Sequence, residues 1–154
     1  MPRWKHWTES GSTETGSASL EFITAGLILL VPLVYLVVAI SAVQGGALAV
    51  EGVARQAARV YVQGADAAEA RDRAVRAVEI GLADYGIGRD DAEVRIDCEG
   101  GTNGCLTRRS AVTVTVRIRV ALPLVPDLLS LRGAASIPLE SSATQTVSRF
   151  WGAG

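Results

Sequence analysis

The chain has 154 residues, with 15 basic and 16 acidic side chains, a net charge of −1, and 49% hydrophobic residues. This length supports one modest domain with an appendage and excludes two independent enzymes. A nearly neutral chain offers no electrostatic footprint for a polyanion, so we expect no nucleic-acid partner.

The first sixteen residues form a hydrophilic leader that ends at Gly16. Its charged residues, two of each sign, are Arg3, Lys5, Glu9 and Glu14. A carboxylate such as Glu21 at the mouth of an apolar helix is costly inside hydrocarbon and calls for a partner. The glycine five residues earlier offers a small, accessible peptide bond. We therefore expect a cytoplasmic leader, residues 1–16, that is cut between Gly16 and Ser17 and leaves Glu21 as the fifth mature residue.

An apolar run follows the leader. No charged residue lies between Glu21 and Glu51, and the stretch 22–43 is almost wholly aliphatic. About 20 residues at about 1.5 Å each cross a hydrocarbon core of roughly 30 Å, and such a helix tolerates Pro32. A chain this short could hardly bury a helix that is apolar all round, so we predict a membrane span. The alternative is a signal peptide cleaved after Ala49, although such peptides have shorter apolar regions of about 7–15 residues.

The helical pattern continues beyond the span as an amphipathic stalk. One stripe, with the 3,4 spacing of a helical face, contains Val50, Val53, Ala57, Val60 and Gly64, with Ala54 and Tyr61 beside it. We predict one helix from about residue 18 to residue 62, inside a segment 17–63 made of the transmembrane helix and the stalk. The stripe either covers the chain's own sheet or packs against neighbouring subunits, and the sequence favours neither.

A second helix is predicted over residues 67–83. Gly64 ends the first helix, and Asp66 with Glu69 resembles a capping box. The expected packing face contains Val75, Val78, Leu82 and Tyr85. An extracytoplasmic α+β domain, residues 64–154, is expected to begin here.

The hydrophobic period then changes to two. Segments 93–97 and 112–120 alternate apolar and polar residues, and 136–147 does so more weakly. This pattern is typical of an antiparallel sheet with one wet face. An apolar, Pro-interrupted segment, 122–131, is expected to start a short helix near Pro126, and it either packs in the core or docks on a membrane or partner. The pair Phe150-Trp151 is expected to anchor the chain end.

Two cysteines indicate the side of the membrane on which this domain lies. Cys98 and Cys105 flank a Gly-rich, turn-forming stretch, so a hairpin would bring them within disulfide range. Unpaired thiols are the alternative, and a zinc site lacks further ligands. Positive charges flank the span equally, with Arg3 and Lys5 before it and Arg55 and Arg59 after it. Because disulfides persist outside the cytosol, we expect an outward-facing C-terminal domain.

The groups needed for catalysis are scarce. His6 is the only histidine, and after Gly16 the chain contains neither His nor Lys. Ser141 and Ser142 lack a base, and Asp90-Asp91 is more typical of a polar turn than of an acid–base dyad. The glycines match no phosphate-binding motif. We expect no enzyme, no catalytic residue, no metal site and no cofactor.

A resemblance narrows the class. The heptapeptide Gly16-Ser17-Ala18-Ser19-Leu20-Glu21-Phe22, followed by an aliphatic span, resembles the class III signal of type IV prepilins. More narrowly, the order of leader, span, stalk, Cys-containing β region and polar tail resembles the TadE-like pseudopilins of the tight-adherence (Tad) pilus system. Thr15 departs from the family, because pilin leaders commonly carry a basic residue there, and this departure bears on processing efficiency.

The resemblance implies that a prepilin peptidase cuts after Gly16. It also implies that Glu21, with Phe22 beside it, docks on a neighbouring subunit by pairing with the freed N-terminal amine of that neighbour. It implies an α+β fold with a long pilin-like helix, in a single-pass protein of the bacterial cell membrane whose N-terminus is cytoplasmic. The implied function is that of a minor pseudopilin in assembly of a Tad-type pilus or related secretion fibre. Its partners would be the membrane, the peptidase and other pilins or assembly proteins. The alternative is an unprocessed single-span protein with an extracytoplasmic binding module.

Overall fold

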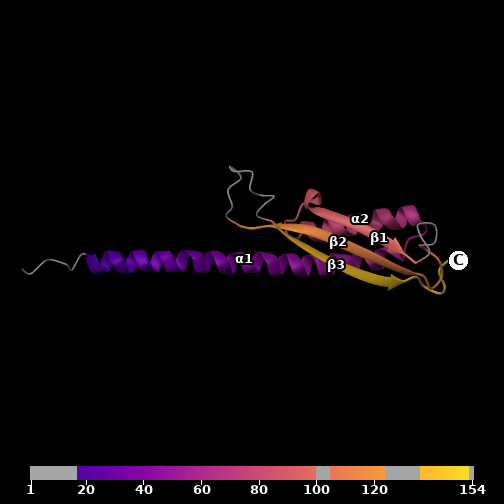
Figure 1. The fold of residues 1–154 in the computed structure, drawn as a ribbon. Coiled ribbons are helices and arrows are strands. Elements are labelled where there is room, and N and C mark those ends of the chain that lie inside the picture. Colours follow the sequence, from indigo (N-terminus) through magenta and orange to yellow (C-terminus); the bar gives the residue numbers. More distant parts are fainter. Residues whose placement is uncertain (1–16, 100–104, 124–135, 153–154) are drawn as a thin grey trace, which may run out of the picture. The chain divides into compact units, whose positions relative to one another are not determined.

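The computed structural model describes residues 17–99, 105–123 and 136–152, and it has the α+β fold expected from the sequence (Figure 1). The elements are α1 (Ser17–Tyr61), α2 (Ala67–Ala83), the 3-10 helix η2 (Arg89–Asp91), β1 (Ala92–Cys98), β2 (Ala111–Ala121) and β3 (Ser136–Thr146). The short helix expected near Pro126 and the leader with Gly16 lie outside the described residues. The chain divides into two compact units, Met1–Val37 and Val38–Gly154, and the second contains α2, the sheet and the C-terminal part of α1.

The stripe on the C-terminal part of α1 packs inside the second unit. Val50, Val53, Ala54, Ala57 and Tyr61 are all buried in one cluster with the inward side chains of β2. Val60, which the spacing placed in the same stripe, is only half-buried and lies outside this cluster. The rest of the stripe packs on the chain's own sheet, which answers the open question about the stalk. Burial of this stripe, more than helix propensity, stabilises the last turns of α1.

The three strands form an antiparallel sheet in the order β1-β2-β3. The central strand β2 alternates as the sequence predicts, and its buried inward side chains are Val112, Val114, Val116, Ile118 and Val120. β1 and β3 present a half-buried inner face and an exposed outer face. One face of the sheet is thus covered and the other is wet.

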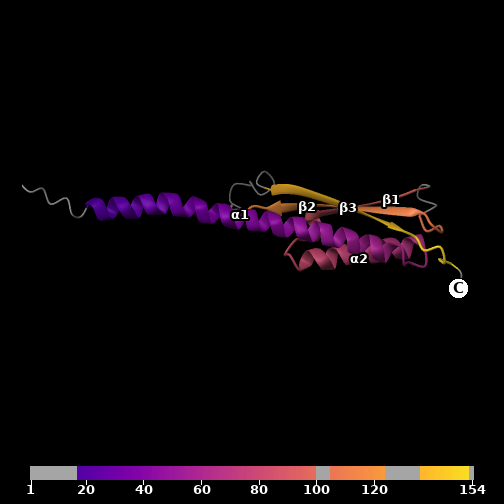
Figure 2. The ribbon, with the colours of Figure 1, turned by 90° about the horizontal axis from the view of Figure 1, so that it is seen from below.

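The C-terminal part of α1 and α2 lie together on the covered face of the sheet (Figure 2). Helix α1 approaches the sheet closely at Gly46, where an added Cβ would lie 2.4 Å from Cγ2 of Val120 and 3.1 Å from Cδ1 of Leu139. The two helices are similarly close at Gly81 of α2, whose Cβ would lie 2.5 Å from Cγ1 of Val53. Glycine at these positions lets the backbones approach one another.

Helix α2 has the bounds and the cap that the sequence predicts. The Asp66 side chain accepts from the N–H groups of Ala68 and Glu69, both at 2.9 Å, and Glu69 accepts from the N–H of Ala65 at 3.1 Å. Its buried face consists of Ala70, Ala74, Val78 and Leu82. The assignment of Tyr85 to this face was wrong, because the helix ends at Ala83 and the tyrosine is 53% exposed.

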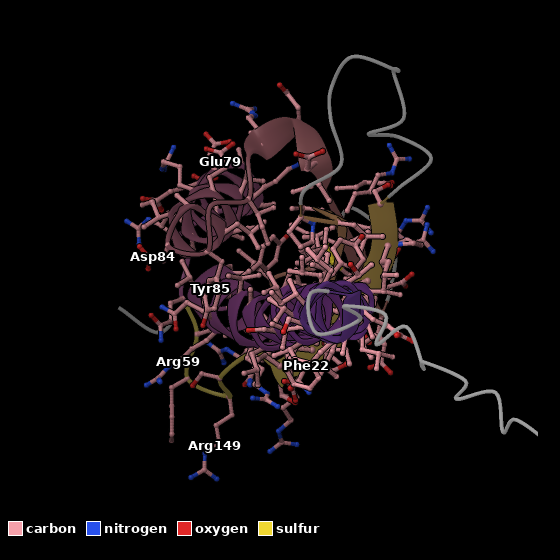
Figure 3. The ribbon with its side chains drawn as sticks, turned by 90° about the vertical axis from the view of Figure 1, so that its left-hand side faces the viewer. Phe22, Arg59, Glu79, Asp84, Tyr85 and Arg149 are labelled. Carbon is pink, nitrogen blue, oxygen red and sulfur yellow. A yellow bond between two sulfur atoms is a disulfide. The ribbon has the colours of Figure 1, made fainter. Side chains whose placement is uncertain are left out.

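The C-terminal anchor is half correct. Trp151 packs against the core and its indole Nε1 donates to the carbonyl oxygen of Gly64 at 3.0 Å. Phe150 does not anchor the chain: its ring is 69% exposed and carries the guanidinium of Arg149 at 4.7 Å from the ring centroid. Figure 3 shows Arg149, Glu79 and Asp84 projecting outward from the second unit.

The close approach at Gly46 yields a stability prediction with an adjacent control. We expect Gly46→Ala to lower the free energy of unfolding by about 1–3 kcal/mol, because the methyl group would overlap the stiff Val120 side chain. Gly45→Ala meets nothing within 4 Å and should instead stabilise the helix by up to about 1 kcal/mol. Urea denaturation of the full chain in detergent, followed by circular dichroism, measures both. Equal effects from the two variants would contradict the packing.

Candidate functional site

The N-terminal half of α1 presents an apolar surface to its surroundings. Helix α1 begins at Ser17, and the candidate processing site therefore has its second residue at the first helical position, whereas Gly16 lies outside the described residues. Apart from the half-buried Tyr35, the large apolar side chains from Leu20 to Ile40 are between 43% and 81% exposed, with Phe22 the most exposed. A continuous apolar surface of this extent marks a membrane or a protein interface.

This helix is long and apolar enough to cross a membrane, as judged by length and composition. An 18-residue stretch within residues 18–61 has a mean hydropathy of 2.7, and none of that stretch is buried by the rest of the chain. The absence of burial separates it from the core helix of a soluble domain, because such a helix would be mostly covered by its own chain.

Glu21 lies one turn inside this helix. Its carboxylate is exposed beside Leu20, Thr24, Ala25 and Ile28. Among the described residues no ion pair involves it. Glu51, the other acid of α1, is ion-paired with Arg55 one turn later. The helix therefore brings a carboxylate that has no ion-pair partner in the described part of the chain to the start of its apolar run, next to the exposed Phe22.

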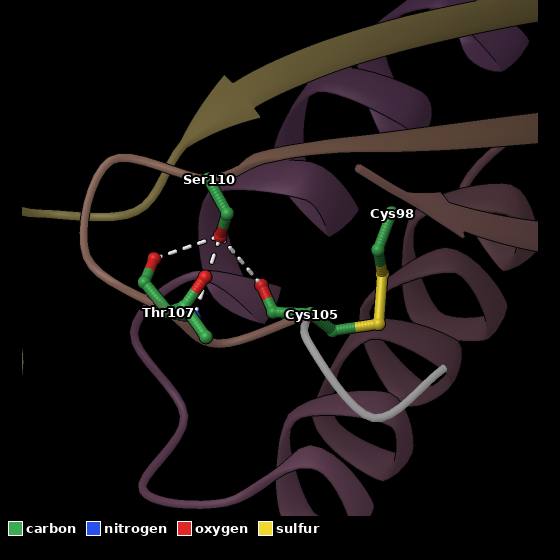
Figure 4. Close-up of a disulfide and its surroundings, with 4 residues drawn as sticks. All are labelled: Cys98, Cys105, Thr107 and Ser110. Atoms are coloured by element: carbon green, nitrogen blue, oxygen red, sulfur yellow. Dashed lines mark hydrogen bonds between the residues drawn. A yellow bond between two sulfur atoms is a disulfide. The ribbon is translucent and has the colours of Figure 1, made fainter. Parts of the chain in front are cut away.

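The disulfide lies at the far end of β1. Cys98 and Cys105 are bonded, with Cα atoms 5.0 Å apart, which is the pairing that the sequence favours over free thiols (Figure 4). The hydroxyl of Ser110 lies 2.9 Å from the Cys105 carbonyl oxygen and 2.7 Å from that of Thr107, and it accepts from the Thr107 N–H at 3.3 Å. The bond joins Cys105 to the last residue of β1, and the Ser110 hydroxyl holds the turn between Cys105 and β2.

The wet face of the sheet carries a ladder of polar side chains. Glu93, Arg117 and Glu140 are in register across the three strands, and Nε of Arg117 donates to the Glu140 carboxylate at 2.5 Å. That hydrogen bond raises the pKa of Arg117 above its ordinary value, with a further contribution from the two carboxylate charges. On the same face, four residues before Arg117 along β2, the hydroxyls of Thr113 and its β3 partner Thr144 form a hydrogen bond of 2.8 Å. These pairs are exposed and act mainly to hold the register.

Within the described residues no group of three or more His, Cys, Asp or Glu side chains could hold a metal ion. Ser141 and Ser142 lie on β3 opposite Val116 and Thr115, with no base beside either in the register. Asp90 and Asp91 form part of η2 and are exposed.

Reasoning from the sequence did not identify the cross-strand pairing of Arg117 with Glu140. Alternation predicted that Arg117 faces water, but its partner depends on the register Arg117↔Glu140, which spans 23 residues and includes a long connection. A search for opposite charges at the polar positions of both strands could have suggested the pair.

No protein-family model matches the chain, and comparison with curated proteins and with solved structures finds no significant match.

Proposed function

We propose that this protein is a TadE-like minor pseudopilin that takes part in assembling a Tad-type pilus or related secretion fibre. The observation that carries the proposal is Glu21, the fifth residue after Gly16: its exposed carboxylate has no ion-pair partner among the described residues, and it lies at the start of the unburied apolar segment of α1. The helix supports anchorage by a single span, and the exposed surface around the carboxylate supports contact between subunits.

The proposed mechanism follows from the cost of a charge in hydrocarbon. Cleavage after Gly16 frees the α-amine of Ser17, and α-amines ordinarily carry a positive charge at neutral pH. Such an amine on a neighbouring subunit would neutralise Glu21 and remove the penalty of leaving that carboxylate alone at the membrane. Phe22 beside it adds a large apolar contact. The prepilin peptidase thus supplies the cation that docking requires.

The orientation is proposed from the disulfide. A bonded Cys98–Cys105 pair is stable outside the cytosol, which supports a cytoplasmic N-terminus and an extracytoplasmic domain in the bacterial cell membrane. There the domain would supply contacts to other pilins or assembly proteins. We propose no enzymatic role and no cofactor.

Intact-mass measurement tests the processing step. In membranes from cells that contain a prepilin peptidase, we expect a chain that begins at Ser17, because the small Gly16 leaves the peptide bond accessible. Cells with an inactivated peptidase provide the control and should retain the full leader. A chain that keeps residue 1 in both would contradict the proposal and favour an unprocessed single-span protein with a binding module. A chain that begins at Val50 would indicate a secreted domain.

A further inference from the structure

We propose that the end of the sheet where β2 ends and β3 begins rests on the outer surface of the membrane, among the phospholipid headgroups. The inference rests on the proposed function, because it takes residues 22–43 as the span. The surface is defined by Tyr85, Arg119, Ala121 and Leu122, and we call it the proximal surface. Its expected occupant is the headgroup layer of the outer leaflet.

The depth of this surface follows from the contact at Gly46. Gly46 is buried by the side chains of Val120 and Leu139, which approach its backbone closely enough to exclude a methyl group. It lies three residues beyond Val43, the last residue of the apolar run, which is about 4.5 Å along a helix. The headgroup region is roughly 5–7 Å thick on each side of the hydrocarbon. Whatever packs on Gly46 therefore lies at headgroup depth.

The direction of the strands also indicates which end of the sheet lies nearer the membrane. Ala121 pairs with Ser136 at the end of the sheet next to Gly46, and Ala111 pairs with Thr146 at the opposite end. That opposite end lies beside the last turn of α1, because the C-terminal Trp151 bonds the carbonyl oxygen of Gly64. Ten residues of strand, about 34 Å, separate the two ends. Only the Ala121 end can reach the membrane.

The chemistry of the proximal surface suits an interface. A groove of about 320 Å³ is lined there by Ala42, Gly45 and Gly46 of α1, by Tyr85 to Ile87, by Asp91, and by Arg119 to Ala121. Tyr85, two residues beyond the end of α2, is exposed. Tyrosine is enriched at headgroup level because its ring is apolar and its hydroxyl is polar. Arg119 can place an apolar stem along the surface and its guanidinium among phosphates.

Depth-dependent quenching tests this surface in the full chain. The chain would be reconstituted in phosphatidylcholine–phosphatidylglycerol vesicles that contain lipids with a nitroxide on the headgroup or on the acyl chain. A fluorescent NBD label would be attached to one added cysteine at a time, with the native disulfide intact: Ala121→Cys at the proximal surface, Thr146→Cys at the opposite end, and Val34→Cys within the span. All three positions are exposed. Tyr85→Cys provides a second proximal position should Ala121→Cys misfold.

We expect headgroup nitroxides to quench the proximal label several-fold more than the Thr146 label, and acyl-chain nitroxides to quench the Val34 label. Quenching at Val34 with a water-exposed label at residues 121 and 85 would overturn this inference and leave the single span intact. A Val34 label in water would overturn the proposed span and this inference with it. Equal headgroup quenching at residues 121 and 146 would also overturn the inference, because the sheet would then lie flat on the membrane.

Discussion

Replacing Glu21 by glutamine is expected to abolish incorporation of the protein into the fibre while leaving leader removal and membrane insertion unchanged. Glutamine keeps the size and exposure of the side chain but cannot neutralise the amine of a neighbouring subunit. Removing one partner of a desolvated ion pair costs about 3–5 kcal/mol. Because each 1.4 kcal/mol is about tenfold, association between subunits should weaken by roughly two to three and a half orders of magnitude. Immunoblotting of sheared surface fibres from cells with the complete assembly system measures the loss.

Glu51 provides the matched control, since α1 contains only these two acids. Its ion pair with Arg55 is exposed, with side-chain accessibilities of 48% and 65%. An exposed i,i+4 pair contributes about 0.3–0.5 kcal/mol, so Glu51→Gln should assemble normally. Normal assembly of Glu21→Gln, or an equal defect in both variants, would contradict a docking role for Glu21.

Carbodiimide chemistry shows which amine the carboxylate meets. An apolar carbodiimide activates a carboxylate in the membrane and couples it to an adjacent amine. If Glu21 pairs with the Ser17 amine of a neighbour, the processed protein should form covalent dimers that Glu21→Gln lacks. The two residues are also four apart on one helix, so coupling within one chain is geometrically possible. Exclusively monomeric adducts would therefore contradict docking between subunits.

The elements of the fold were predictable because each has a strong local signal. The bounds of α2 follow from Gly64, from the capping residues Asp66 and Glu69, and from the apolar spacing that ends near Leu82. β2 follows from strict alternation over its length. The long uncharged run of α1 fixes its helical state whatever surrounds it. Local chemistry of this kind needs no tertiary information.

The packing partners of individual side chains were harder to predict from the sequence than the elements themselves. Tyr85 fits the period of α2 but lies past the end of the helix, so periodicity alone placed it wrongly. The buried face uses Ala70 and Ala74, whose small side chains allow close packing and give a weak hydrophobic signal. The partner of the stalk stripe depended on the sheet folding back over α1, a long-range choice that the stripe itself cannot encode. Glu21 was conspicuous only because the surrounding residues carry no charge.

Breaking the disulfide is expected to lower the stability of the second unit substantially. Cys98 and Cys105 close a short loop, with a sequence separation of 7. Loop-closure entropy then gives a stabilisation of about 2.5 kcal/mol relative to the open chain. A three-stranded sheet covered by two helices is a small domain, and 2.5 kcal/mol is a large part of the 5–15 kcal/mol typical of domains. We therefore expect Cys98→Ser/Cys105→Ser to unfold at a clearly lower urea concentration than the oxidised wild type.

The double variant also provides its own control. Reductant should lower the urea midpoint of the wild type to that of the double variant, and it should leave the double variant unchanged. A wild-type midpoint that is insensitive to reductant would show that the bond contributes little. If the expected loss is found, the domain is most stable where the bond persists, because the reducing cytosol keeps thiols free. In the proposed orientation, full stability would then be reached only after β1 and β2 have crossed the membrane.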